Sequence, residues 1–201
     1  MGGPPRCFPV ASILLRPVVP PEQRFLVSAA VALSARTALT RLCGLQPALK
    51  WPNDLVVGDR KLGGLLSEVV GDGVGYVVGI GVNLQWPGPE GVGGTCVLDE
   101  IGVSIEPRAM LDITLGELGR RRSLLDSVDG RTQLHEELVG ALATLGQTVR
   151  VERTDGFITG TAVSLEHDGT LIVATTEGNE AVRYGDIVHL RRAETSRSRF
   201  S

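Results

Sequence analysis

The chain has 201 residues, of which 42% are hydrophobic and 21% are charged, and its formal net charge is −3. These values are ordinary for a globular protein that buries a core, and the length suits one domain with or without a small appendage. The acidic balance argues against a general nucleic-acid-binding protein. No apolar run reaches the roughly 18 residues of a membrane span, so no membrane association is expected. The three cysteines are isolated, which indicates reduced thiols in the cytoplasm rather than disulfides or a zinc site.

The first part of the chain predicts one helix between short strands. Residues 1–6 are rich in glycine and proline and are expected to be irregular or disordered. The apolar run at 10–15 predicts a buried strand. Over 22–43 the apolar residues recur at helical spacing, and Gly44 supplies the stop, so a helix is predicted there. A second short strand is predicted to end at 50–51.

Residues 52–94 predict turns and strands. Proline, asparagine and aspartate at 52–54 favour a turn, and a strand is expected directly after it, at 55–57. Strands at 61–70 and 75–83 are predicted to form a hairpin through Gly71-Asp72-Gly73. Within the second of them, the segment 77–82 is apolar at every position, which predicts a central strand buried on both faces. A loop is expected at 85–94.

The remainder predicts two helices and then a separate set of strands. The helices are expected from Pro107 towards Leu125 and over about 132–145. Five short strands with Asp-Gly and Gly-Asp turns follow, a pattern typical of a small SH3-like β-barrel. They are predicted at 148–152, 158–165, 170–175, 180–184 and 187–190.

The predicted fold class is therefore α+β: a mixed sheet with helices on one side, followed by a small SH3-like β-barrel. The first domain is expected to cover residues 1–146 and the second 147–192. The polar residues 193–201 are expected to form a disordered tail.

Rare residue types gather between positions 50 and 86. The two lysines of the chain, Lys50 and Lys61, lie here, whereas its other cations are eighteen arginines. Both tryptophans and two of the three asparagines lie in the same stretch. The charge of lysine is a compact ammonium group, whereas that of arginine is spread over a planar guanidinium. A site that needs a point charge at short range therefore does not tolerate the replacement of lysine by arginine.

The same stretch combines groups that suit an anionic ligand. A lysine can hold a phosphate or carboxylate, an aspartate can hold a metal or hydroxyl, and asparagine can contact an adenine edge. Glycines allow the main chain to approach a ligand closely. Each feature alone is also compatible with an ordinary turn or with close strand packing. Neither a Rossmann fingerprint nor a nucleophile elbow is present in the sequence.

Three segments carry a resemblance to a known family. They are Lys50-Trp-Pro-Asn-Asp54, Arg60-Lys-Leu-Gly-Gly-Leu-Leu-Ser-Glu68 and Gly79-Ile-Gly-Val-Asn83. In this order and spacing they resemble the catalytic domain of biotin protein ligases. The strands predicted after residue 146, with Gly185-Asp186 before the last of them, are similar to that family's small SH3-like domain. The resemblance covers residues 10–192.

The resemblance implies a ligase that uses biotin and ATP with Mg²⁺ to form biotinyl-5′-AMP and then biotinylates a lysine of a biotin carboxyl carrier domain. By position, Lys61 matches the catalytic lysine that touches biotin and the α-phosphate. Asn53 and Asp54 match the nucleotide side of the site, with Asp54 a Mg²⁺ candidate, and Asn83 matches the adenine contact. At the head of the motif, support or nucleotide contact is implied for Lys50 and Trp51. The family's biotin pocket is matched by Gly63, Gly64, Leu66, Gly79 and Gly81.

The sequence departs from the family's pattern before residue 10. The family's biotin-anchoring turn and its Arg-Gly-rich loop precede the strand that matches 10–15, and the first nine residues here contain neither. We therefore expect a fragment or mis-started form of a full-length ligase, or else an inactive short paralogue that binds a carrier protein or dimerises. A lipoate ligase or octanoyl transferase is a weaker alternative, because the Trp-Pro-Asn-Asp motif and the barrel favour biotin. A homodimer formed through sheet edges is compatible with the sequence.

Overall fold

The computed structural model describes residues 10–71, 73–89, 91, 93–153, 156–183 and 189–192. The chain divides into two compact units, Met1–Leu142 and Ala143–Ser201. The predictions for residues 1–6, for the tail at 193–201 and for the turns at Asp72 and Gly185-Asp186 lie at least partly outside the described residues.

The first unit is built on a five-stranded sheet. Its strands are β1 (Val10–Leu15), β2 (Ala48–Lys50), β3 (Asp54–Val57), β4 (Arg60–Val70) and β5 (Gly75–Val82), in the order β1-β5-β4-β3-β2. All four strand pairings are antiparallel. Single parallel bridges join Leu49 to Leu142 and Lys61 to Gly94. The α+β class is confirmed. A mixed sheet was predicted, and in the described part of the chain its only parallel pairings are these two single bridges.

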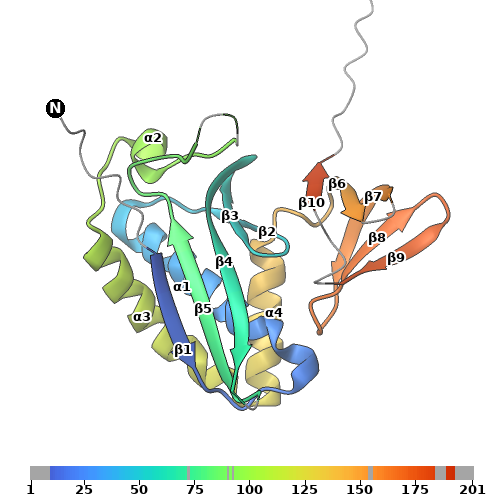
Figure 1. Cartoon of the computed structure of the whole chain (residues 1–201), viewed down its shortest axis with the longest axis horizontal. Coiled ribbons are helices and arrows are strands. Elements are labelled where there is room, and N and C mark those ends of the chain that lie inside the picture. The colour runs from blue at the N-terminus through green and yellow to red at the C-terminus, as the bar shows by residue number, and fades with distance from the viewer. Residues whose placement is uncertain are drawn as a thin grey trace, which may run out of the picture. The chain divides into compact units, whose positions relative to one another are not determined.

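Helices cover one face of this sheet and leave the other open, as predicted (Figure 1). A short 3₁₀ turn, η1 (Pro21–Gln23), leads into α1 (Phe25–Cys43), and α3 (Pro107–Leu124) and α4 (Val128–Ala141) pack beside α1. Helix α1 ends at Gly44, which has a φ of 73° and donates its N–H to the Thr40 carbonyl at 3.0 Å. Only glycine adopts this left-handed conformation without steric cost, which explains the predicted stop.

The segment Pro21–Cys43 is long and apolar enough, by length and composition, to cross a membrane. In the structure 61% of its apolar window is buried. Leu26, Leu33 and Leu39 of α1 are almost completely inaccessible to solvent. Burial of this kind is what the central helix of a protein core requires.

Strand β5 is buried on one face only, which corrects the prediction of burial on both. Tyr76, Val78, Ile80 and Val82 are buried on the helix-covered face, whereas the intervening Val77, Gly79 and Gly81 are half-exposed. Successive side chains of a strand point to opposite faces, so the second set belongs to the open face. This set is small or apolar although it is not covered by helices.

Strand β1 is an edge strand among the described residues rather than the buried strand that its composition predicts. It pairs with β5 alone, from Val10 opposite Gly81 to Leu15 opposite Tyr76. Ser12 and Leu14 are exposed on the open face, and Leu14 keeps 49% of its surface accessible.

The second unit contains the five predicted strands. They are β6 (Thr148–Arg153), β7 (Gly156–Leu165), β8 (Leu171–Thr175), β9 (Gly178–Val182) and β10 (His189–Arg192). They form an antiparallel sheet in the order β10-β6-β7-β8-β9, with a buried face that includes Val149, Val151 and Val173. The described pairings do not join β9 to β10, so the part of the chain that is described shows a sheet and no closed barrel.

Two helical features differ from the sequence-based expectation. Helix α4 begins at Val128 instead of about 132, because Ser127 caps it: the Gly130 N–H donates to the Ser127 Oγ at 3.1 Å. A five-residue helix, α2 (Val97–Ile101), follows the loop after β5 and was not predicted. Its short length gives no periodic signal in the sequence.

Candidate functional site

Glycines form the floor of the open face where β4 and β5 lie side by side. The register places Gly64 opposite Gly81 and Leu66 opposite Gly79, and Asp54 of β3 opposite Gly64. Without side chains, these glycines expose the main chain of two neighbouring strands to any molecule above them. Leu66, which is 64% exposed, stands at the border of this floor.

The structure separates the roles of the individual glycines. A Cβ at Gly63 would overlap with the Gly81 carbonyl oxygen, so this glycine is required by the packing of two strands. At Gly64 a Cβ would lie 3.1 Å from Asp54 Oδ1 and 3.3 Å from Lys61 Nζ, so this glycine leaves room for those side chains. At Gly79 a Cβ would meet only the Leu66 carbonyl oxygen, at an ordinary 3.6 Å. Packing within the chain therefore does not require glycine at position 79.

Lys61 and Asp54 form an ion pair beside this floor. Lys61 Nζ lies 2.5 Å from Asp54 Oδ1, with the two side chains 53% and 23% exposed. The same oxygen is inaccessible to solvent, so Asp54 Oδ1 is buried against the ammonium group of Lys61. A partly exposed pair of this kind contributes little to stability, and the half-exposed side chain of Lys61 is open to a ligand.

A bulge brings Lys61 to the open face. Between β3 and β4 the register shifts, since Val56 pairs with Lys61 but Leu55 pairs with Gly63. The intervening Leu62 is fully buried on the helix side. The extra residue changes the parity of the strand, so Lys61 and Gly64 share one face although they are three positions apart.

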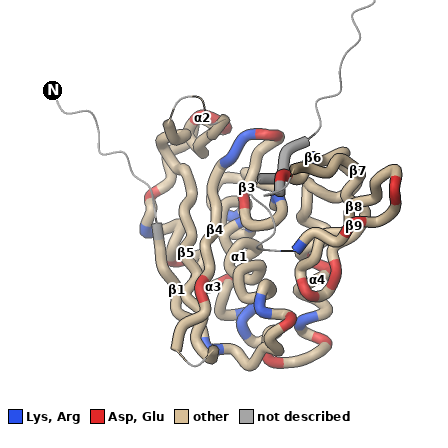
Figure 2. Tube along the Cα trace, turned by 45° about the vertical axis from the view of Figure 1, so that its right-hand side comes forward, with Lys and Arg blue, Asp and Glu red and all other residues tan. Residues whose placement is uncertain are grey.

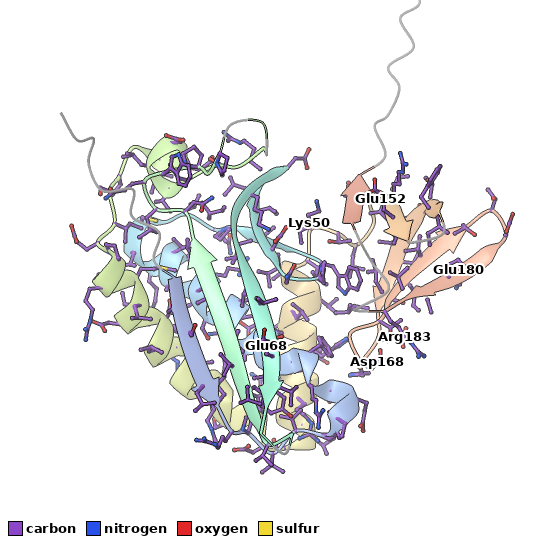
Figure 3. All side chains as sticks on the ribbon, in the orientation of Figure 1. Lys50, Glu68, Glu152, Asp168, Glu180 and Arg183 are labelled. Carbon is purple, nitrogen blue, oxygen red and sulfur yellow. The ribbon has the colours of Figure 1, made fainter. Side chains whose placement is uncertain are left out.

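Charged groups continue along the open face. Lys50 pairs with Asp54 across β2 and β3, and Glu68 lies further down β4, as Figure 3 shows. The turn from β3 to β4 adds Asp59 and Arg60, and Figure 2 shows charges of both signs at this end of the sheet. The floor is therefore bordered by two ammonium groups and one carboxylate at the end where β4 begins and β5 ends.

The other predicted site residues are engaged by the protein itself. Trp51 is 5% exposed, and its peptide bond to Pro52 is cis. The side-chain amide of Asn53 donates to the Leu65 carbonyl at 2.6 Å, and the main-chain carbonyl of Asn53 accepts from the Leu65 N–H at 2.9 Å. Asn83 donates its amide to main-chain carbonyls in a neighbouring loop. The structure thus brings Lys50, Asp54, Lys61, Gly64, Leu66, Gly79 and Gly81 together on the open face, with Trp51, Asn53, Gly63 and Asn83 in the supporting frame.

Other features of the structure lie away from this floor. An apolar cavity of about 310 Å³ is on the helix side of the sheet, lined among others by Ala11, Ile80 and Met110. The described residues contain no group of three or more His, Cys, Asp or Glu side chains suited to a metal ion. The pKa of the Cys96 thiol is raised, chiefly by burial, so this cysteine is a neutral core residue. At the border of the floor itself, Ser12 is exposed on β1 opposite Gly79; sequence reasoning missed this position because an isolated serine carries no signal.

Comparisons with known proteins agree with this arrangement. Residues 11–85 match the family model described as Biotin/lipoate A/B protein ligase family, and residues 144–190 match the Biotin protein ligase C terminal domain. The biotin–[acetyl-CoA-carboxylase] ligase of Mycobacterium tuberculosis is 32% identical over 189 residues, which are 90% of this chain and 69% of that protein. The chain belongs to the biotin protein ligase family.

Solved structures show the same fold. The biotin protein ligase of Aquifex aeolicus superposes with a TM-score of 0.80 and 26% identity, covering 92% of this chain and 82% of that one. The same Aquifex enzyme in complex with biotin and ATP gives a TM-score of 0.77 and 25% identity, with 92% and 78% coverage. The fold and the family expected from the three sequence motifs are confirmed.

Proposed function

We propose that this protein is an ATP-dependent ligase that joins biotin to a lysine of a biotin carboxyl carrier domain in the cytoplasm. In the first step a carboxylate oxygen of biotin attacks the α-phosphorus of ATP, and pyrophosphate leaves. In the second step the carrier's lysine amine attacks the acyl carbon of biotinyl-5′-AMP, AMP leaves, and the amine loses a proton. The names of the relatives and of the Aquifex complex with biotin and ATP support this assignment.

The observation that carries the proposal is the glycine floor with the ammonium group of Lys61 at its end. Gly64, Gly79 and Gly81 leave the main chain of β4 and β5 uncovered, with Leu66 at the border, and such a surface suits a flat, largely apolar ligand. Lys61 then stands where the carboxylate of such a ligand would meet a phosphate. Its charge offsets the negative charge that develops on the equatorial oxygens during phosphoryl transfer.

Asp54 suits the magnesium ion that accompanies ATP. Mg²⁺ is commonly held by one or two carboxylates together with substrate phosphates and water, so a single carboxylate is a sufficient protein ligand. Because Oδ1 is buried against Lys61 Nζ, the ion would be held through the other carboxylate oxygen of Asp54. We assign a phosphate contact to Lys50, and its register opposite Asp54 in the neighbouring strand supports this assignment. The burial of Trp51 and the main-chain contacts of Asn53 and Asn83 favour supporting roles over direct nucleotide contact.

Biotin-dependent exchange of pyrophosphate into ATP tests the first step. We expect Lys61→Ala to lower the exchange rate by about 10²–10³-fold, the usual effect of removing one electrostatic donor from a transition state. Lys61→Arg should restore only part of the rate, because a planar guanidinium does not replace a compact ammonium. Arg108→Ala is the matched control, since it removes an exposed cation of α3 whose partner is Asp112. Exchange by the Ala variant equal to that of the wild type would contradict the role of Lys61.

A second candidate function is a non-catalytic module that binds a carrier domain or a second copy of itself. The open backbone edge of β4 supports self-association, because residues 66–70 have no strand beside them on the β3 side among the described residues. Calorimetry separates the two candidates. Binding of a carrier domain without binding of biotin or ATP would favour the module, whereas binding of biotin and ATP supports the ligase. A homodimer stays a prediction, and analytical ultracentrifugation tests it by measuring the mass of the protein in solution.

A further inference from the structure

The loop after β5 returns to lie against the start of β4. We call residues 84–96 the return loop; positions 90 and 92 are outside the described residues. The Lys61 N–H donates to the Gly93 carbonyl at 3.1 Å, and the Thr95 N–H donates to the Lys61 carbonyl at 2.9 Å. Lys61 also pairs with Val56 of β3 on its other side. The main chain of Lys61 is therefore enclosed between β3 and the return loop.

Asn83 closes the neck of this loop. Its side-chain amide donates to the Thr95 carbonyl at 3.0 Å, with longer contacts of 3.3 Å to the Pro87 carbonyl and 3.4 Å to that of Lys61. A Cβ at Gly94 would overlap with the Pro87 carbonyl, so the two stems of the loop touch at this point. The amide of Asn83 thus joins both stems of the loop to β4.

Glu100 on α2 adds a second connection. The Thr95 hydroxyl donates to Glu100 Oε1, and Arg60 Nη2 donates to Glu100 Oε2 at 3.0 Å. The side chains of Thr95 and Glu100 are 1% and 9% exposed, whereas that of Arg60 is 56% exposed. Because Arg60 directly precedes Lys61, this carboxylate couples the return loop and α2 to the strand that carries the lysine. Figure 1 shows α2 at the same end of the sheet as the start of β4.

We propose that Glu100, together with Asn83, is a positioning residue for Lys61: the Thr95–Glu100–Arg60 chain and the Asn83 amide fix the backbone from which the lysine projects onto the glycine floor. The proposal rests on the proposed function, since it assigns these contacts to the same site. A misplacement of about 1 Å in a reacting group can cost on the order of 10²-fold in rate. Contacts that fix the backbone of Lys61 therefore affect the rate of the proposed reaction.

The kinetic test compares Glu100→Ala with the wild type in biotin-dependent pyrophosphate exchange. We expect kcat to fall tenfold or more while the KM for biotin changes less than threefold, because the floor that binds biotin is intact and the misplaced charge acts in the transition state. Arg60→Ala should give a similar fall, and the double variant should be no slower than the slower single variant, since both remove one coupled contact. Glu106→Gln, which neutralises an exposed carboxylate at the N-cap of α3, is the matched control.

A structural test does not depend on catalysis. Hydrogen exchange of the Lys61 and Thr95 amides should become at least tenfold faster in Glu100→Ala, whereas the amides of β5 keep their protection. Unchanged protection at Lys61 and Thr95 would overturn the proposal even if the protein proves to have no ligase activity. Equal kcat in the wild type and Glu100→Ala, or additive losses from Glu100→Ala and Arg60→Ala, would overturn it in an active enzyme. If the wild type shows no exchange but the predicted change in protection is found, the proposed function fails and the positioning contact stands.

Discussion

Gly79→Ala distinguishes a glycine that serves a ligand from one that serves the fold. The new Cβ would meet only the Leu66 carbonyl oxygen at 3.6 Å, an ordinary contact. Replacing glycine by alanine inside a strand stabilises the chain by roughly 0.5–1 kcal/mol when the conformation permits it. We therefore expect the variant to be at least as stable towards urea as the wild type.

The same methyl group would occupy the space in which biotin is proposed to lie. Forcing one extra carbon into a packed contact costs about 1–3 kcal/mol, and 1.4 kcal/mol corresponds to a tenfold change in affinity, so biotin should bind about 5- to 150-fold more weakly. Titration calorimetry with biotin measures this change. Gly119→Ala on α3, where a Cβ meets nothing within 4 Å, is the control and should leave the affinity unaltered. A folded Gly79→Ala protein that binds biotin as tightly as the wild type would refute the assignment of this floor to biotin.

Two further variants test the frame of the site and the helical layer. Gly63→Ala should lower the free energy of unfolding by about 1–3 kcal/mol, measured by urea denaturation, because its Cβ would overlap with the Gly81 carbonyl; wild-type stability would contradict this packing. Glu117 is 4% exposed, and a hydrogen bond from Arg120 and the nearby charges of Arg41 and Arg121 hold its pKa below the ordinary value, although burial opposes the shift. A lowered pKa contributes stability above the unfolded value of about 4.3, and this contribution is lost as the pH falls through the folded pKa. Glu117→Gln should therefore be less stable than the wild type by roughly 1–3 kcal/mol at pH 7, with the difference shrinking below about pH 4 in thermal or urea unfolding; a difference independent of pH would contradict the assignment.

Local patterns predicted most elements of the fold but not the geometry that makes the site. Glycine and the helical period located α1 and its end, because such signals are local in the chain. The alternation rule alone places Lys61 and Gly64 on opposite faces, and only the register shift at Leu55 and Val56 brings them together. No residue type marks that bulge in the sequence.

The side chains of the two motif asparagines show a second limit of sequence reasoning. The side chains of Asn53 and Asn83 have the chemistry to contact a nucleotide. In the structure their amide groups instead donate hydrogen bonds to the main-chain carbonyls of Leu65 and Thr95. An amide donates equally well to a ligand or to a main chain, and the choice depends on contacts between segments that are distant in sequence. The apolar segment of β5 was misjudged for a related reason, since its glycines suit an open face as well as a buried one.

The floor and the lysine belong to one hairpin, β4 and β5, and this has a consequence for how the protein folds. Contacts between neighbouring segments form with a small loss of chain entropy, so the pairing of β4 with β5 closes only a short loop, whereas the bulge that turns Lys61 to the open face also requires β3. The pairing of β1 with β5 closes a longer loop, because α1 and three strands lie between them in the chain. The surface proposed for biotin is thus made by pairings between segments that are close in the chain, and biotin bound there would raise the free energy of unfolding of the protein by mass action.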